Sequence, residues 1–293
     1  MVAVIIPTLN AEKELPVLLK RLAMQIYPPD ELLVVDSCST DSTREIACSC
    51  PCVRLITVSP SEFDHGTTRD WAFRQTKADF VCFLTQDALP MEDTYLQCLL
   101  TAFADERVAA VCGRQVAREN ARPEERLTRI YNYPATSFTR TREDLPRLGI
   151  KTFFLSDACS AYRRTAYEQV GGFEHGVRTN EDMLIAAKLI AADWRIAYCA
   201  EARVRHSHSL TLRQEYRRNY EVGAFLKAHE AVLMGAKAES EGVRYVHTVA
   251  LGLLKECRIF SFLRFGAICA AKLLGNRMGI RAQTKCHPSD RGV

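Results

Sequence analysis

Val2-Ala-Val-Ile-Ile6 is a short apolar run that stops at Pro7, and Glu31-Leu-Leu-Val-Val35 is a second run of the same kind. Runs of this length are typical of strands that are covered on both faces of a sheet. Between the two runs, Pro28-Pro29 ends a stretch in which leucines recur at helical spacing: Leu15, Leu18, Leu19 and Leu22. The N-terminal sequence therefore predicts a strand, a helix and a second strand.

The same alternation continues to the middle of the chain. Further strands are expected at 53–58 and 79–84, with a helix at 67–76, and Thr8 or Asn10 is expected to cap the first helix. This rhythm predicts an α/β fold, a Rossmann-like and mostly parallel sheet with helices on both faces. Ligands bind such sheets at the carboxyl ends of the strands. Polar residues that follow the strands are therefore candidates for a site: Thr8, Asn10, Asp36, residues 64–69 and Asp87.

The second half of the chain is less regular. Residues 114–150 are polar and rich in proline, and we expect them to leave the sheet. Beyond them the pattern predicts strands at 151–162 and 194–199 and a helix at 181–192. These elements give the expected boundaries: a domain over 1–210, a helical extension over 211–281 and a polar tail over 282–293.

Composition excludes several classes of protein. Of 293 residues, 47% are hydrophobic and 25% charged, which excludes wholesale disorder. The net charge of +4 is small, and no basic stripe interleaved with aromatic residues occurs in the first 200 residues, so we expect no nucleic-acid partner. Charged residues interrupt the apolar stretch 246–274, so no membrane-spanning segment is expected.

The 12 cysteines are expected to be reduced thiols in a cytoplasmic protein, because no signal peptide precedes them and several fall on apolar runs. Cys48, Cys50 and Cys52 form a cluster with one-residue gaps. This spacing does not match the paired Cys-x-x-Cys pattern of zinc sites.

Four motifs occur in order along the chain: Ile5-Ile-Pro-Thr-Leu-Asn10 with Val34-Val-Asp-Ser-Cys-Ser-Thr-Asp-Ser-Thr43, then Phe83-Leu-Thr-Gln-Asp-Ala88, Asn180-Glu-Asp182 and Val204-Arg-His-Ser-His208. This set resembles the family 2 glycosyltransferases, which have the GT-A fold and act on nucleotide-sugars. A second set resembles the bacterial rhamnosyltransferases that build surface polysaccharides: Phe63-Asp-His-Gly66 with Arg69, Gly113-Arg-Gln115, Asn132-Tyr-Pro134, Tyr162-Arg-Arg164 and Gly171-Gly-Phe173.

The resemblance implies a division of the domain into a nucleotide-sugar half over about 1–115 and an acceptor half over about 116–210. It assigns nucleotide-sugar binding to these residues: Pro7, Thr8, Asn10, Asp36, Gly66, Arg69, Gln86, Asp87, Arg114 and Gln115. A carboxylate at a strand tip, such as Asp36, can accept the imide N–H of uracil or thymine. Asp36 could instead only cap a turn, and Arg69 could lie on a solvated helix face.

Family members carry Asp-x-Asp where this chain has Thr85-Gln86-Asp87. One carboxylate can still hold Mg²⁺ or Mn²⁺ together with diphosphate oxygens and water. The resemblance adds His206 to this metal site, with His208 as a second candidate. Asp87 could instead cap a helix beginning near Glu92, and either histidine could be a neutral core or loop residue.

An inverting transfer needs a base on the acceptor side to take the hydroxyl proton. The resemblance assigns that base to Asp182, with Glu181 raising its basicity or orienting the acceptor. Side chains at consecutive helix positions diverge, so the pair is not expected to act as one dyad. Asp182 could instead be a charge favoured by the helix dipole.

Together these features predict an inverting, metal-dependent transferase that moves rhamnose from dTDP-rhamnose to a glycan or lipid-linked saccharide. Two alternatives remain: a transferase of the same fold that uses a UDP- or GDP-hexose, and a non-catalytic nucleotide-sugar-binding protein. Apolar residues mixed with cations over 245–281 suit a helix on an anionic membrane surface, here the inner face of the cytoplasmic membrane. The alternative is that these helices pack on the domain or form a homo-oligomer.

Overall fold

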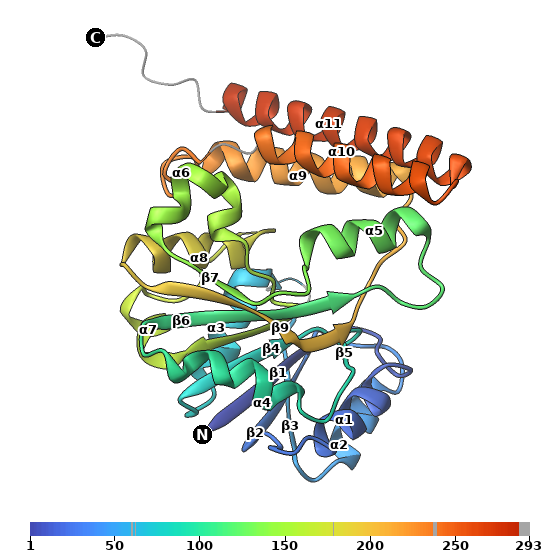
Figure 1. Ribbon diagram of the computed structural model, residues 1–293. Helices are drawn as coiled ribbons and strands as arrows, with labels where there is room; N and C mark the ends of the chain where they lie inside the picture. The colour runs from blue at the N-terminus through green and yellow to red at the C-terminus, as the bar shows by residue number, and fades with distance from the viewer. Residues whose placement is uncertain (60, 62, 178, 237–238, 287–293) are drawn as a thin grey trace.

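A computed structural model describes residues 1–59, 61, 63–177, 179–236 and 239–286 of the chain. Within these residues a single nine-stranded sheet carries the fold (Figure 1). Its strands are β1 (Val2–Thr8), β2 (Glu31–Asp36), β3 (Val53–Thr57), β4 (Phe80–Leu84), β5 (Leu89–Pro90), β6 (Val108–Val116), β7 (Phe138–Arg140), β8 (Cys159–Arg163) and β9 (Arg195–Arg205).

Helices cover the sheet and extend the chain beyond it. They are α1 (Leu15–Ala23), α2 (Thr43–Ser49), α3 (His65–Arg74), α4 (Tyr95–Thr101), α5 (Pro123–Asn132), α6 (Leu145–Leu148), α7 (Arg164–Gln169), α8 (Glu181–Ala191), α9 (Leu212–Ala228), α10 (Glu239–Lys255) and α11 (Ile259–Cys286). Short 3₁₀ turns lie at Ala102–Ala104, Arg142–Asp144 and Gly149–Phe153.

The strand order is β3-β2-β1-β4-β8-β6-β9-β5, with β7 also paired to β9. The first four strands are mutually parallel, and β6 is parallel to β9. Strand β8 is antiparallel to both β4 and β6, which lets those two strands point the same way. The predicted mostly parallel sheet with helices on both faces is confirmed, and two buried apolar clusters fill its two sides.

Several local predictions are wrong. Helix α1 begins at Leu15 after Glu14, so neither Thr8 nor Asn10 caps it. Strand β8 starts only at Cys159, because residues 149–153 form a 3₁₀ turn instead of the predicted strand. The polar tail begins later than expected, since α11 continues to Cys286, and residues 287–293 lie outside the described part of the chain.

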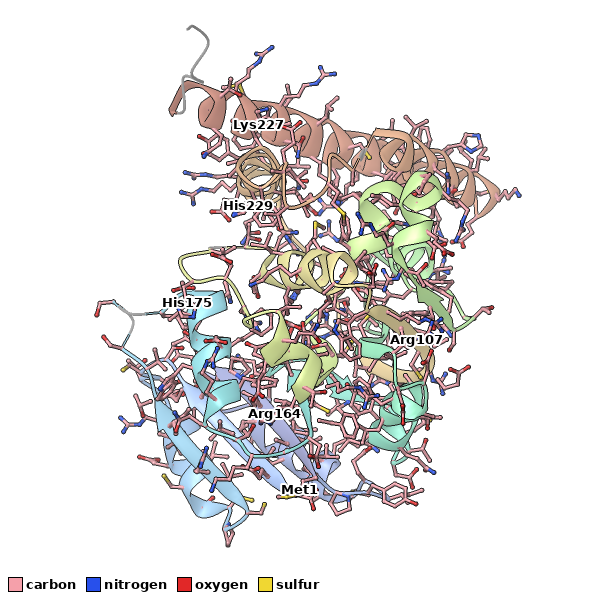
Figure 2. All side chains as sticks on the ribbon, turned by 90° about the vertical axis from the view of Figure 1, so that its left-hand side faces the viewer. Met1, Arg107, Arg164, His175, Lys227 and His229 are labelled. Atoms are coloured by element: carbon pink, nitrogen blue, oxygen red, sulfur yellow. The ribbon has the colours of Figure 1, made fainter. Side chains whose placement is uncertain are left out.

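The three C-terminal helices form a layer of their own above the sheet domain (Figure 1). Helix α11 packs closely along α9: a Cβ on Gly279 would come 1.9 Å from the Tyr220 carbonyl oxygen, and one on Gly275 would come 2.3 Å from that of Tyr216. Figure 2 shows Met1 at the opposite end of the molecule from Lys227 and His229 of this layer. Helices α9 and α11 are therefore packed tightly against each other within the extension.

The stretch Ile259–Thr284 is one continuous helix, and by length and composition alone it could cross a membrane. This differs from the sequence-based expectation that no segment qualifies. Only 17% of its most apolar window is buried. Helix α9 packs along one side of α11, and several apolar side chains of α11 are exposed, among them Phe260, Leu263 and Leu274.

Candidate active site

A crevice lies at the carboxyl ends of β1, β2 and β4, where the strand order reverses direction. A cavity of about 490 Å³, here called the crevice cavity, opens there. Topological switch points of this kind are the usual ligand sites of open α/β sheets. The crevice cavity brings together five predicted nucleotide-sugar residues: Pro7, Thr8, Asn10, Arg69 and Gln86.

Asp36 is fully buried beneath the turn that follows β2. Its carboxylate accepts hydrogen bonds from the Ser39 amide (2.9 Å) and the Ser39 hydroxyl (2.5 Å). Next to this turn, Asn10 accepts a bond from the Thr40 amide (2.9 Å). Asp36 is not among the residues that line the crevice cavity, so in this structure it supports the turn from below.

A second cavity of about 680 Å³, the central cavity, shares His65 and Thr85 with the crevice cavity. Asp87 lies in its wall, 3.5 Å from Nε2 of His206 and 3.6 Å from Nδ1 of His208. The potential ligand atoms of these three residues lie within 4.8 Å of one another. One carboxylate and two imidazoles at this spacing fit a divalent transition-metal site.

The protonation states in this cluster also fit a cation. Burial alone would raise the pKa of Asp87, but its hydrogen bond with His206 and the charges of both histidines hold that pKa well below its usual range. Burial, followed by the charge of His206, lowers the pKa of His208 to about 4. Asp87 is therefore ionised near pH 7, as a carboxylate that binds a metal must be.

Gln115 lies behind His206 and fixes its ring. Its amide oxygen is 2.9 Å from Nδ1 of His206, and its amide nitrogen donates to the Ser156 hydroxyl (2.8 Å). This leaves Nε2 of His206 facing Asp87. Partners of this kind orient metal-binding histidines, so Gln115 contributes to the cluster through His206.

Arg114, the next residue along β6, is not brought to this site. Consecutive strand residues point to opposite faces, and the register of β6 on β9 shifts between Gly113 and Arg114. Its charge acts on Glu201, whose pKa is lowered first by a hydrogen bond from Ser137 and also by Arg114. Arg114 lines neither the crevice cavity nor the central cavity.

A second group of charges is buried where α3 meets the start of α8. Arg69 forms an ion pair with Glu181 (2.7 Å) and lies 3.6 Å from Asp157. Asp157 also accepts hydrogen bonds from the hydroxyls of Ser160 (2.6 Å) and Tyr162 (2.7 Å). Arg69 is 7% exposed, which rules out the alternative of a solvated helix face.

Asp182 lies beside these three residues. We call the set of four the acid cluster: Arg69, Asp157, Glu181 and Asp182. The Asp182 carboxylate accepts from the amides of Met183 (2.8 Å) and Asp157 (3.4 Å). Burial, then the charges of Glu181 and Asp157, raises the pKa of Asp182 well above its usual value. Three carboxyls facing one guanidinium thus raise the pKa of the Asp182 carboxyl.

Gly66 positions Arg69 by allowing α3 to pass close to the loop before α8. A Cβ at Gly66 would lie 2.0 Å from the carbonyl oxygen of Glu174. Asp64 starts the helix, because its carboxylate accepts from the Thr67 amide (2.8 Å). The role of Gly66 in this structure is therefore packing. Its lack of a side chain lets α3 lie close to this loop, and α3 carries Arg69 to the acid cluster.

Comparison with known proteins identifies this arrangement. Residues 3–171 match the sequence model of the family described as Glycosyl transferase family 2. The chain belongs to this family. The transferase is also 42% identical over 257 residues to the O-antigen chain rhamnosyltransferase WbaN of Salmonella anatum, a match that covers 87% of this chain and 81% of that one.

Another relative, the O-antigen chain rhamnosyltransferase RfbN of Salmonella typhimurium, is 38% identical over 280 residues, covering 95% and 89% of the two chains. Among solved structures, the mannosyltransferase PcManGT of Pyrobaculum calidifontis in complex with GDP-Man and Mn²⁺ aligns with a TM-score of 0.63 at 19% identity, covering 99% and 88%. At that identity the likeness concerns the fold. The family and the GT-A fold that the sequence predicted are confirmed.

Some site residues of the transferase were missed or misplaced by sequence reasoning. Asp157 was not singled out, although it is an acidic residue inside the predicted strand 151–162. Arg217 and Arg218 of α9 were also not among the predicted site residues, and they line the central cavity. Asp87 does not cap a helix, because α4 begins only at Tyr95 after Thr94.

Proposed function

We propose that this transferase moves rhamnose from dTDP-rhamnose, with inversion, to a hydroxyl of a glycan or lipid-linked saccharide in surface polysaccharide synthesis. The observation that carries the proposal is the similarity to two O-antigen chain rhamnosyltransferases over most of the chain. The two cavities that meet at His65 and Thr85 provide room for the nucleotide and for the sugar with its acceptor.

The crevice cavity would hold the nucleotide against Pro7, Thr8 and Asn10. Asp36 would act on the base through the turn that it supports, since its carboxylate already accepts two bonds from Ser39. Gln86 exchanges hydrogen bonds with the backbone of Leu9 (2.8 and 3.2 Å) and so fixes the loop that contacts the nucleotide.

Asp87 and His206 would hold Mg²⁺ or Mn²⁺, with His208 as a third ligand. When bound, such an ion stabilises negative charge on a departing diphosphate. Thr85 stands where the family has a first carboxylate, so Asp87 is the only acidic ligand in the cluster of three. Arg118 lies 3.7 Å from the Asp87 carboxylate and is a further cation beside it.

Asp182 would be the base. The acceptor oxygen forms a bond to the anomeric carbon while the bond from that carbon to the diphosphate breaks, and the hydroxyl proton passes to the Asp182 carboxylate. The raised pKa of Asp182 makes it a stronger proton acceptor than an ordinary carboxylate. Arg69 and Glu181 would position it without contacting the substrate.

A donor screen tests this function. The wild-type chain is incubated with dTDP-rhamnose, UDP-hexoses or GDP-hexoses in Mn²⁺ or Mg²⁺, and release of the nucleoside diphosphate is measured. We expect dTDP-rhamnose to be consumed fastest. Preferential consumption of a UDP- or GDP-hexose would favour the second candidate donor class, and no release from any donor would favour a non-catalytic role.

We also propose that the outer face of α11 rests on the inner surface of the cytoplasmic membrane. Its apolar residues are strongly exposed: Ile259 (64%), Phe260 (90%), Leu263 (63%) and Leu274 (58%). Exposed Arg258, Arg277 and Arg281 flank them and suit an anionic surface. Arg264 and Lys272, which the sequence suggested would join these cations, instead turn inward to Glu124 (2.9 Å) and Glu215 (3.8 Å).

Sedimentation with anionic vesicles tests this second proposal on the full chain. Phe260→Asp with Leu263→Asp should reduce binding at low salt by tenfold or more, since both apolar side chains would leave the interface. Met24→Asp, at an exposed position directly after α1 (56%), is the control. Equal partitioning of wild type and the double variant would instead favour an oligomer interface or packing role.

A further inference from the structure

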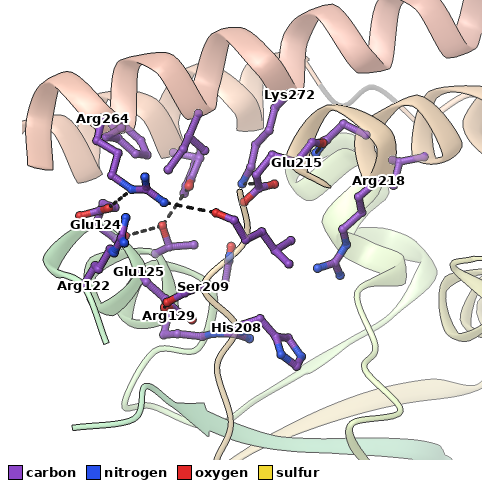
Figure 3. A pocket seen from close by; sticks show the side chains of 18 of the residues that line it. Arg122, Glu124, Glu125, Arg129, His208, Ser209, Glu215, Arg218, Arg264 and Lys272 are labelled. Carbon is purple, nitrogen blue, oxygen red and sulfur yellow. Dashed lines mark hydrogen bonds and ion pairs between the residues drawn. The ribbon is translucent and has the colours of Figure 1, made fainter. Parts of the chain in front are cut away.

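A third cavity, of about 310 Å³, lies between α5 and α11 and is closed below by residues 208–210 (Figure 3). We call it the α5–α11 pocket. It shares five lining residues with the central cavity: Arg129, Tyr133, His208, Leu210 and Arg218. The pocket therefore adjoins the central cavity, and residues of helix α11 line its outer side.

Two carboxylates of α5 in this pocket are incompletely paired. Glu124 is 4% exposed, and its Oε1 accepts from Nε of Arg264 at 2.9 Å (Figure 3). Its Oε2 has no hydrogen-bond partner among the described residues, nor has Oε1 of Glu125. A buried carboxylate oxygen without a donor costs free energy, so these atoms suit a ligand that brings hydrogen-bond donors.

The remaining walls supply aromatic surface and donors. Tyr133 and Tyr245 line the pocket, and the Tyr245 hydroxyl is 2.9 Å from that of Thr128. Arg218 supplies hydrogen-bond donors and lines both this pocket and the central cavity. Aromatic faces with both acceptors and donors match a sugar ring, whose hydroxyls donate and accept.

We propose that the α5–α11 pocket is a subsite for a neutral sugar residue of the acceptor, held by Glu124 and Glu125 through its hydroxyls. This inference rests on the proposed function and adds the place where the acceptor is recognised. The lining also holds five cations, Arg122, Arg129, Arg218, Arg264 and Lys272, so inorganic phosphate is the competing ligand that the test below must exclude. The helical extension thereby becomes part of acceptor recognition.

Ligand-observed NMR tests the subsite without turnover. The full chain is titrated with methyl glycosides of rhamnose, mannose, galactose and glucose up to about 10 mM, the range expected for single-sugar contacts. We expect saturation transfer to at least one glycoside in the wild type. Glu124→Gln and Glu125→Gln should weaken it about tenfold or more, because a carboxamide has lost one acceptor oxygen and gained a donor.

Glu256→Gln is the matched control. Glu256 pairs with Arg126 of α5 (2.5 Å) and so also ties the extension to α5, but it lies outside the pocket. Saturation transfer from the Glu256→Gln variant to the glycoside should equal that from the wild type. Thermal melting checks that all three variants fold. Absence of transfer to wild type, equal signals in wild type and both pocket variants, or displacement of the glycoside by inorganic phosphate would overturn the subsite.

Donor consumption, measured on the same wild-type sample, separates this inference from the function on which it rests. If dTDP-rhamnose is consumed but no glycoside binds, the subsite is wrong and the function stands. If a glycoside binds and both Gln variants lose it while no nucleotide-sugar is consumed, the proposed donor chemistry is wrong and the pocket still binds a sugar.

Discussion

Asp87, the proposed metal ligand, and Asp182, the proposed base, are two carboxylates with opposite electrostatic surroundings. Asp87 faces two histidines and Arg118, and its pKa is held well below its usual range despite partial burial. Asp182 faces Glu181 and Asp157, and its pKa is raised well above that range. A metal ligand must stay ionised, whereas a base must be able to hold a proton. The comparison therefore separates two roles that the residue type alone does not distinguish.

The two environments have different structural origins. Asp87 follows a strand that ends at the crevice, and its histidines come from the end of β9. Asp182 is the second residue of α8, whose N-cap Asn180 has a φ of 60°, and it lies near its neighbour Glu181 and near Asp157 from a separate segment. A strand end at an open cavity thus gives a solvent-accessible ligand, and a crowded helix start gives a basic carboxylate.

The largest effect is expected from Asp182→Asn. An amide cannot take the acceptor proton, so transfer should fall by about 10²–10⁴-fold. The transfer rate is measured at saturating donor and acceptor. Glu174→Gln, an exposed residue just before α8, is the control, and near-normal turnover of Asp182→Asn would remove the base assignment.

Glu181→Gln should reduce the transfer rate less than Asp182→Asn does, and it should shift the pH dependence of kcat/KM. Removing the Glu181 charge lowers the pKa of Asp182, so the base loses its proton at lower pH and the acid limb of kcat/KM moves to lower pH. The plateau rate should fall about tenfold because a weaker base drives proton transfer less. Arg69 loses its 2.7 Å partner, so the melting temperature is recorded as well. An acid limb that stays in place would show that Glu181 does not tune the base.

Asp157→Asn is expected to change stability more than catalysis. Burial, opposed by Arg69, raises the pKa of Asp157 to about 6. A carboxyl with a raised folded-state pKa favours the fold when protonated, so its contribution is present below about pH 4 and is lost as pH rises through 6. The melting temperature of the variant minus that of the wild type should therefore increase between pH 4 and 6. A constant difference over this interval would contradict the raised pKa.

The sequence was sufficient for the strands of the first half of the sheet and for the grouping of Asp87, His206 and His208. Each strand of the first half is a local apolar run, and the polar residue that ends it points to the same edge of the sheet. His206 and His208 also follow a strand, at the spacing that places both on one face. Such features depend on neighbouring residues, and they were predicted correctly.

The acid cluster and the α5–α11 pocket depend on contacts between distant segments. Asp157 gains its role from Arg69, and Arg264 and Lys272 turn inward only because Glu124 and Glu215 lie opposite. Helix α11 carries apolar residues on much of its surface, so its sequence does not reveal which side packs on α9. The orientation of these cations required the structure.

The most direct test of the two roles, metal ligand for Asp87 and base for Asp182, is a dTDP titration. The nucleotide is titrated with and without Mn²⁺ into the wild type, Asp87→Asn and Asp182→Asn. The account predicts that Mn²⁺ strengthens dTDP binding equally in the wild type and Asp182→Asn and has no effect on Asp87→Asn, which lacks the ionised ligand. Retention of the Mn²⁺ effect in Asp87→Asn, or its loss in Asp182→Asn, would contradict the assignment of the two carboxylates.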